Sequence, residues 1–225
     1  YAASSTMLNK SSWQDASRVV VTWSDPYPEM AGLELSEAAK RLGISEEEAL
    51  DALSPGGGVY FTMDEADVRR ILSDPGAMIG SDGVPFSKRP HPRLYGTFTR
   101  VLGHYARDEG LFSFEEAVRR MTSHPAAEFG LAGRGVLEPG AIADIAIIDP
   151  ATVKDTATYD APTKTSEGVS AVFVSGQCVY QEGTSTGARP GRVLRRDDKG
   201  LAAWRPPSSP IAPHLYATRV RGSST

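Results

Sequence analysis

The chain has 225 residues, and 40% of them are hydrophobic. This composition is that of an ordinary globular protein, which excludes wholesale disorder, and the length predicts one domain or two small ones. With 24 Lys and Arg residues against 28 Asp and Glu residues, the net charge is -4, so the chain is a poor candidate for binding nucleic acid.

Two further properties of the sequence limit the kind of protein. Cys178 is the only cysteine, so neither an internal disulfide nor a zinc cluster built from cysteines can form within the chain. The longest apolar stretches, at 18–23 and 145–148, are too short to cross a bilayer, and no signal peptide pattern is present. We therefore expect a cytoplasmic protein without a membrane partner. The chain opens at Tyr1 without a start methionine, which suggests a piece of a larger protein.

The first quarter of the chain predicts one strand and two short helices. A run of β-branched residues at 18–23 predicts the strand. A helical pattern over 36–42 ends at a glycine, which is a typical residue just beyond a helix. Ser45 and Glu48 form a capping box, which begins a second helix that ends near Leu53.

The next segment predicts a linker and then a strand–helix–strand unit. The glycine-rich stretch at 54–58 lacks the Lys-Ser or Lys-Thr pair of a phosphate-binding loop, so a plain linker is favoured. Buried strands are predicted over 59–63 and 77–80, and a helix from Asp64 to Leu72 joins them. Such a unit is typical of folds with parallel strands.

The rest of the chain predicts helices first and strands afterwards. Helices are predicted over 96–107, 113–122 and 125–130, the second of them opened by a capping box. Strands are predicted within 140–150 and, as a hairpin, over 169–175 and 178–181. The Pro- and Ser-rich tail from Trp204 is expected to be extended, either packed along the surface or partly disordered.

Asp82 is the first candidate for a chemical role. It directly follows the predicted apolar strand at 77–80 and lies between Gly80 and Gly83. In a parallel α/β barrel the C-terminal ends of the strands form the active-site face. A Ser-Asp-Gly turn is also common at protein surfaces, so the local pattern leaves both interpretations open.

Arg93 is the second candidate, in a basic loop that follows Asp82. An arginine in such a loop could hold a substrate carboxylate through two parallel hydrogen bonds. The alternative is solvated basic surface. It fits Lys88 and Arg89 better than Arg93, which lies in the ordered context Pro-Arg-Leu-Tyr.

The other reactive side chains favour structural roles. The histidines lack the spacing of metal ligands; they are His91, His104, His124 and His214. His104 and His124 are expected to be structural, and Cys178 is expected to be a packed core thiol. No series of Ser, His and Asp residues has a context that points to a nucleophilic triad.

Several stretches point to a known family. The most specific are Pro-His-Pro-Arg-Leu-Tyr-Gly-Thr-Phe at 90–98 and Thr-Gly-Ala-Arg-Pro-Gly at 186–191, whereas the Ala-Asp strand at 140–144 is shared more widely. Further matching pieces are 1–8, 60–65, 79–83, 129–131 and 192–194. Together they resemble the C-terminal half of the N-acyl-D-amino-acid deacylases, or D-aminoacylases, of the amidohydrolase superfamily. The resemblance runs from residue 1 to about residue 196.

The resemblance implies an α/β fold. This chain would supply the C-terminal part of a (β/α)8 barrel of the TIM type, with a lid insertion and a small β domain. Residues 1–58 would form the lid insertion, residues 59–130 the last strands and helices of the barrel, and residues 131–196 the small β domain. The tail at 197–225 has no counterpart in the family.

The resemblance also implies roles for three residues. Asp82 would be the catalytic general base and acid, and could be a ligand at a second metal site. Arg93 would bind the carboxylate of the substrate, and Ser5 would contact the substrate as well. The main Zn²⁺ ligands, a Cys and two His, are expected outside this chain. The expected partner is therefore the N-terminal half of the same enzyme, as a separate chain.

The implied activity is zinc-dependent hydrolysis of N-acyl-D-amino acids, small molecules that yield a carboxylic acid and a free D-amino acid. At 84–87 the chain departs from many relatives, which have a polar His-Asp pair after the proline, so the substrate preference stays open. Two alternatives remain. A cyclic-amide hydrolase of the hydantoinase or dihydroorotase type would use a strand-end Asp without needing the motif at 90–98. A non-catalytic subunit would lack the metal.

Overall fold

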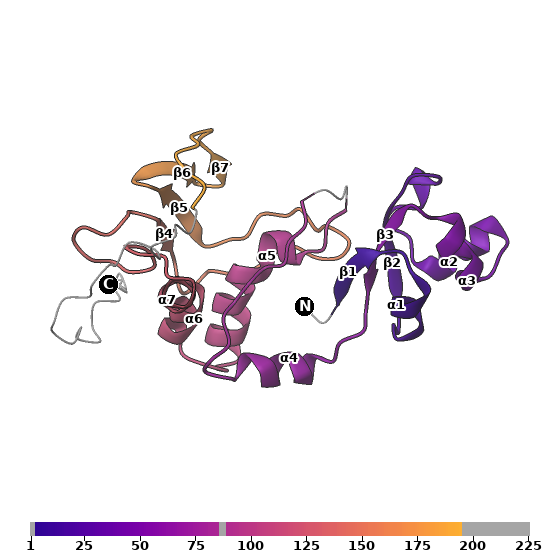
Figure 1. Ribbon diagram of the computed structural model, residues 1–225, viewed down its shortest axis with the longest axis horizontal. Helices are drawn as coiled ribbons and strands as arrows, with labels where there is room; N and C mark the ends of the chain where they lie inside the picture. Colours follow the sequence, from indigo (N-terminus) through magenta and orange to yellow (C-terminus); the bar gives the residue numbers. More distant parts are fainter. Residues whose placement is uncertain (1–2, 86–88, 195–225) are drawn as a thin grey trace, which may run out of the picture.

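The computed structural model describes residues 3–85 and 89–194. Figure 1 shows two groups of elements along the long axis of the molecule. The first strands and helices, in indigo and violet, form one group, and the later helices and strands, from magenta to yellow, form the other. Helix α4, Glu65–Leu72, lies between the two groups.

A three-stranded antiparallel sheet organises the N-terminal group. Its central strand is β3, Gly56–Tyr60, which pairs with β1, Ser4–Met7, on one side and with β2, Val19–Ser24, on the other. Every residue of β3 is buried. The strand predicted over 18–23 is therefore confirmed as β2.

Short helices surround this sheet. They are α1 (Lys10–Gln14), the 3₁₀ helix η1 (Pro28–Met30), α2 (Leu35–Leu42) and α3 (Glu46–Ala52). The predicted capping box is present, because the Glu48 amide donates to Ser45 Oγ at 3.2 Å and the Glu48 carboxylate accepts from the Ser45 amide at 2.9 Å. Such reciprocal bonds satisfy amides that the first turn of a helix leaves without partners.

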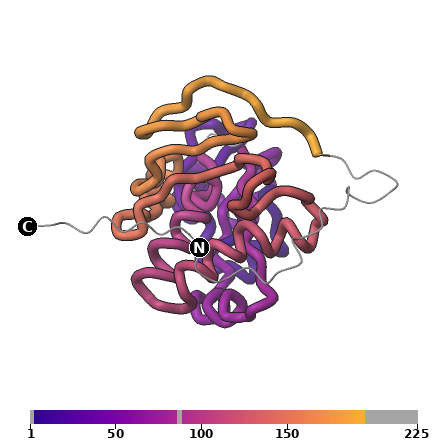
Figure 2. Tube along the Cα trace, turned by 90° about the vertical axis from the view of Figure 1, so that its left-hand side faces the viewer, coloured from indigo at the N-terminus to yellow at the C-terminus, as the bar shows by residue number. Residues whose placement is uncertain are grey.

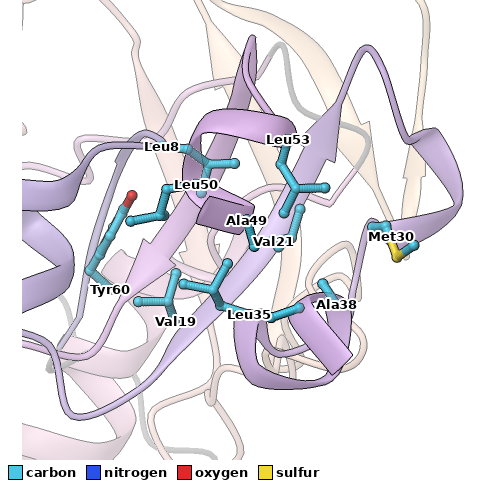
Figure 3. Packing of buried hydrophobic residues seen from close by; sticks show 11 residues of the cluster. Leu8, Val19, Val21, Met30, Leu35, Ala38, Ala49, Leu50, Leu53 and Tyr60 are labelled. Carbon is cyan, nitrogen blue, oxygen red and sulfur yellow. The ribbon is translucent and has the colours of Figure 1, made fainter. Parts of the chain in front are cut away.

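The core of this group lies between the sheet and the helices α2 and α3. Its fully buried side chains include Val21, Leu35, Leu50, Leu53 and Tyr60. Figure 3 shows the leucines gathered around Val21 and Tyr60 of the sheet. Burying a side chain of leucine size contributes about 1.5–3 kcal/mol, so this cluster is the main source of stability in the N-terminal group.

The glycine-rich segment is a buried strand, so the linker predicted over 54–58 is wrong. A Cβ at Gly56 would stand 2.5 Å from Leu53 O and 2.9 Å from Trp23 O. The missing side chains therefore allow neighbouring backbone to pack directly against the strand. The observed strand β3 therefore starts at Gly56 and ends at Tyr60, whereas the strand was predicted over 59–63.

The strand predicted over 77–80 does not form in the described structure. These residues have no strand pairing, and the Ile79 amide donates to Arg120 O at 3.1 Å. A strand requires the backbone of a neighbouring strand, and the described residues place none beside this segment. Helix α4 forms as predicted, with Asp64 capping the Ala66 amide at 2.6 Å. Both sheets are antiparallel, so the barrel stays a prediction from the resemblance.

The second group contains a long helical stretch. Helix α5, Arg93–Arg100, continues directly into the π-helix η2, Val101–Asp108, and begins before the predicted range of 96–107. The next helices are α6 (Phe114–Met121) and α7 (Ser123–Glu128). Pro125 is the third residue of α7, although it was predicted to be the first. Buried side chains of η2 pack with Ala117 of α6 and with Val153 in a second core.

A four-stranded antiparallel sheet completes the described chain. In order it contains β4 (Ile145–Ile148), β5 (Val169–Val174), β6 (Gln177–Gln181) and β7 (Thr184–Ser185). The hairpin predicted near 176–177 is confirmed as β5–β6. In Figure 2 these orange strands lie to one side of the helices of the second group. Cys178 is half-buried in β6.

No helix among the described residues has both the length and the apolar character needed to span a membrane.

The buried position of β3 can be tested at Gly57. Gly57→Ala should lower the free energy of unfolding by about 1–3 kcal/mol, because overpacking a tight site forces its neighbours to move. The new methyl would overlap the Trp23 indole nitrogen and stand 2.9 Å from Thr22 Oγ1. Gly191→Ala is the matched control, since the nearest atom there lies at 4.0 Å. Urea unfolding of the complete protein measures both variants, and equal midpoints would contradict the packing of β3.

Candidate active site

Asp82 lies at the end of the 77–80 segment with its side chain in solvent. The side chain is 82% exposed, and the backbone has a φ of +47°. Aspartate is one of the few residues that adopt this left-handed conformation at modest cost. The next residue, Gly83, packs closely on α5, because a Cβ there would stand 2.6 Å from Leu94 Cδ1. This close packing presents the Asp82 carboxylate beside the first turn of α5.

Arg93 is the first residue of α5, and the structure brings it into contact with Asp82. Its Nη2 lies 2.7 Å from Asp82 Oδ2, and its Nε donates to the Asp82 carbonyl at 2.9 Å. The Arg93 side chain is only 14% exposed. The alternative of a freely solvated basic side chain is therefore wrong for Arg93. The neighbouring Arg89 is half-buried as well, and it donates to Asp160 O at 3.1 Å.

A cavity of about 220 Å³ opens next to this pair. Asp82 and Arg93 both line it, and so do Arg100 and Tyr105 from the helical stretch that follows. The apolar part of the lining comes from α4, the 77–80 segment and η2: Val68, Leu72, Met78, Ile79 and Val101.

Ser5 lies on β1 and is not among the residues that line this cavity. It is half-buried and pairs with Val59 of β3. His91 nevertheless connects the two elements. Its buried side chain bonds to the carbonyl of Ala3, just before β1, and to the backbone amide of Arg93. The structure thus links the strand of Ser5 with the helix of Arg93, although it does not bring the two side chains together in the cavity.

His91 is the residue that the sequence interpretation missed. Its side chain is buried, and its Nδ1 accepts a hydrogen bond from the Arg93 amide at 3.1 Å. Because Nδ1 carries no proton there, Nε2 carries it and donates to Ala3 O at 3.1 Å. Burial, assisted by the charge of Arg93, lowers the pKa of His91 to about 3. The sequence signal that could have identified His91 is the pair of prolines on either side of it in Pro-His-Pro-Arg.

A second polar network includes Tyr105, which also lines the cavity. Tyr105 donates to Glu65 Oε1 at 2.5 Å, and burial together with this bond raises the pKa of Tyr105 to about 12. Arg69 makes two hydrogen bonds to Glu109, at 2.7 and 2.9 Å, and His104 Nε2 lies 3.1 Å from the same carboxylate. These contacts join α4 to η2 and support the structural role expected for His104.

The side chains described here do not form a metal site by themselves. Within 3–85 and 89–194, no group of three or more His, Cys, Asp or Glu residues could hold a metal ion. The exposed carboxylate of Asp82 fits the chemistry of a single ligand from this chain. The expectation that the main zinc ligands come from outside this chain stays a prediction.

Several sequence-based predictions fall outside the described residues. These are the roles considered for Lys88 and His214, the tail at 197–225 and part of the departure at 84–87. Val84 is described and is exposed.

Comparisons with known proteins agree with the resemblance. Residues 32–180 match the model of the amidohydrolase family. D-aminoacylase from Alcaligenes xylosoxydans xylosoxydans is 53% identical over 196 residues, which cover 87% of this chain and 40% of that protein. This chain therefore spans about 40% of the length of the curated relative.

Solved structures give the same result. A D-aminoacylase described for the functional role of its binuclear metal center has a TM-score of 0.84 and 50% identity, and the match covers 87% of this chain and 41% of the other. N-acyl-D-glutamate deacylase from Bordetella bronchiseptica, complexed with zinc and a phosphonate mimic of the tetrahedral intermediate, has a TM-score of 0.82 and 48% identity, with the same coverage.

The buried neutral His91 should make the protein sensitive to acid. Its folded pKa of about 3 lies below its ordinary value of 6.5, so between these values only the unfolded state binds the proton. Stability should therefore fall as the pH falls through this window, with a contribution of about 1.4 kcal/mol per pH unit.

The measurement is urea unfolding of the complete protein at pH values from 7.5 down to about 4.5. His91→Gln, which does not titrate, should flatten the dependence relative to the unaltered protein. His104→Gln is the matched control and should leave the His91 contribution in place. Parallel pH profiles for the unaltered protein and His91→Gln would show that His91 is not buried in its neutral form.

Proposed function

Since this chain belongs to the amidohydrolase family, we propose that it is the C-terminal part of a zinc-dependent enzyme that hydrolyses N-acyl-D-amino acids. The observation that carries the proposal is the pairing of an exposed carboxylate, Asp82, with a held guanidinium, Arg93, beside one cavity. The identity of 53% to a D-aminoacylase supports the amide as the bond that is cleaved.

In this proposal Asp82 is the general base and then the general acid. Water is a weak nucleophile at neutral pH, so its attack on an amide carbonyl requires removal of a proton in the transition state. The Asp82 carboxylate accepts that proton as the C–O bond forms. It then returns the proton to the nitrogen as the C–N bond breaks, and the products are a carboxylic acid and a free D-amino acid. The exposure of Asp82 supports this role, because a proton carrier must reach the reacting atoms.

Arg93 binds the α-carboxylate of the substrate. Its guanidinium already makes two contacts to Asp82, one through Nη2 and one through Nε. A planar fork of donors is suited to a carboxylate, and a side chain that is mostly buried loses little freedom when it binds. Holding the carboxylate determines which face of the α-carbon enters the site, which is how a D-amino acid would be selected. Ser5, on the strand connected to this helix through His91, would contribute a further substrate contact.

The cofactor in this proposal is Zn²⁺, in line with the zinc in the related deacylase structure. Zinc supplies a polarised carbonyl and a bound water with a pKa of about 7. From this chain, Asp82 would contribute one carboxylate ligand at a second metal site. The main ligands, a Cys and two His, would come from the N-terminal half of the enzyme.

Asp82 can be tested by removing its proton acceptor without disturbing the backbone. Asp82→Asn should lower kcat by about two orders of magnitude or more, because general acid–base groups typically contribute 10²- to 10⁴-fold. Asparagine also tolerates the positive φ of this position, so the fold should survive. Asp15→Asn, at an exposed aspartate that ends α1, is the control and should keep normal turnover. Near-normal turnover by Asp82→Asn in the intact enzyme would remove Asp82 from the mechanism.

Arg93 can be tested with two substrates. Arg93→Ala should lower kcat/KM for an N-acyl-D-amino acid by about 30-fold or more, the equivalent of losing about 2 kcal/mol from a charged contact. An amide that lacks the carboxylate should be affected far less. Arg70→Ala, at an exposed arginine on α4, is the matched control. Equal losses on both substrates would contradict the binding role.

We further propose that the remaining strands and metal ligands come from a separate, larger N-terminal polypeptide. Large apolar side chains are exposed on several elements of this chain, among them Ile71, Met78, Phe98, Phe129 and Leu137. An exposed apolar surface of this kind is typical of a binding interface, and an obligate interface buries more than about 2,000 Å².

The assembly can be tested by expressing this chain alone and together with the N-terminal half. Alone, it should aggregate or stay partly unfolded and should bind no stoichiometric zinc. Co-expression should yield a soluble complex that contains zinc and hydrolyses N-acyl-D-amino acids. A monodisperse species of 24.1 kDa that is active unaided would contradict the assembly. A complex that folds without zinc and without activity would instead favour the non-catalytic subunit.

A further inference from the structure

His91 occupies a buried position between two elements that the proposed function uses. Its side chain is 4% exposed, and it lies between the buried Pro90 and Pro92. On one side it contacts the chain just before β1, and on the other it contacts the start of α5. The rings of His91 and Tyr159 pack edge to face, with 5.3 Å between the ring centroids.

On the α5 side, His91 supplies the hydrogen bonds that a helix cap normally makes. The capping residue is Pro92, which makes no side-chain cap bond. The first two amides of the helix bond to His91 instead: the Arg93 amide to ring Nδ1 at 3.1 Å, and the Leu94 amide to the carbonyl at 3.0 Å. Because the ring bonds to the amide of Arg93 itself, it determines where the Arg93 side chain starts.

On the β1 side, the same ring donates from Nε2 to Ala3 O at 3.1 Å. Ser5 is two residues further along the chain, within β1. The His91 side chain therefore bonds both to the backbone of Arg93 and to the backbone just before β1, although His91 and Ala3 are 88 residues apart in the sequence.

We propose that His91 is a positioning residue for substrate binding: its two ring nitrogens hold Arg93 and the strand of Ser5 at the separation that receives the substrate carboxylate. This inference rests on the proposed function. His91 does not touch the reacting atoms and takes no part in the proton transfers assigned to Asp82. Its loss should therefore weaken binding of the carboxylate and leave the chemical step largely intact, since a shift of about 1 Å in a binding group is costly.

Three variants in the intact enzyme separate the two bonds from the packing. His91→Phe keeps a buried ring beside Tyr159 and removes both bonds. His91→Asn keeps an acceptor for the Arg93 amide, and His91→Gln keeps a donor for Ala3 O. For an N-acyl-D-amino acid, His91→Phe should raise KM by about tenfold, with kcat changed by less than about threefold. Asn and Gln should each recover part of the loss. His104→Asn is the matched control and should leave KM unchanged.

A double-mutant cycle with Arg93→Ala tests whether His91 acts through Arg93. In that background His91→Gln, which lacks the acceptor for the Arg93 amide, should have no further effect on KM, whereas a general structural role would add its effect in both backgrounds. This comparison uses the Gln variant, so it holds even if His91→Phe fails to fold.

The outcomes distinguish the inference from the function on which it rests. Absence of hydrolysis by the unaltered enzyme would overturn the proposed function and this inference with it. If the unaltered enzyme hydrolyses the substrate while the His91 variants change kcat and KM equally on substrates with and without a carboxylate, that result would overturn the positioning role alone. An unchanged KM in all three variants would also overturn the positioning role alone.

Discussion

The candidate site depends on the close packing of Gly83 against helix α5. A Cβ at Gly83 would stand 2.6 Å from Leu94 Cδ1 and 2.9 Å from Leu94 Cα, so any larger residue would push the two segments apart. With glycine there, Asp82 reaches the side chain of Arg93, and its carbonyl as well as its carboxylate is bonded to the guanidinium. The constraint leaves the arginine mostly buried and the aspartate in solvent, which agrees with the different tasks proposed for them.

Aromatic contacts hold the two groups of elements together around this point. The Tyr159 ring lies 4.7 Å from Phe61, which directly follows β3, and 5.3 Å from His91. The Arg18 guanidinium also packs on Phe61, 4.0 Å from the centroid of its ring. Stacked and edge-to-face contacts of this kind typically contribute about 0.5–1.5 kcal/mol beyond burial. The segment around Tyr159, far along the chain, therefore contributes to the position of His91 and through it to that of Arg93.

The predictions from sequence succeeded where the signal was local. Ser45, Asp64 and Ser113 begin helices as expected, because a cap involves only the next few residues. The predictions failed where pairing between distant strands decided the secondary structure. The glycines at 54–58 carry no local strand signal and become a central strand only because β1 and β2 lie on either side. The apolar run at 77–80 has a strand signal and no strand beside it in the described structure.

By itself, the sequence determined the family, the helices with local caps and the two residues proposed for the chemistry, Asp82 and Arg93. The motif at 90–98 carries this information because it is a specific combination of residues within a few positions. Only the tertiary structure decided that the Arg93 guanidinium contacts Asp82 and that His91 connects α5 to the chain before β1. The bond from His91 to Ala3 closes a loop of 88 residues, and no pattern within a short window can specify which backbone carbonyl lies at its far end.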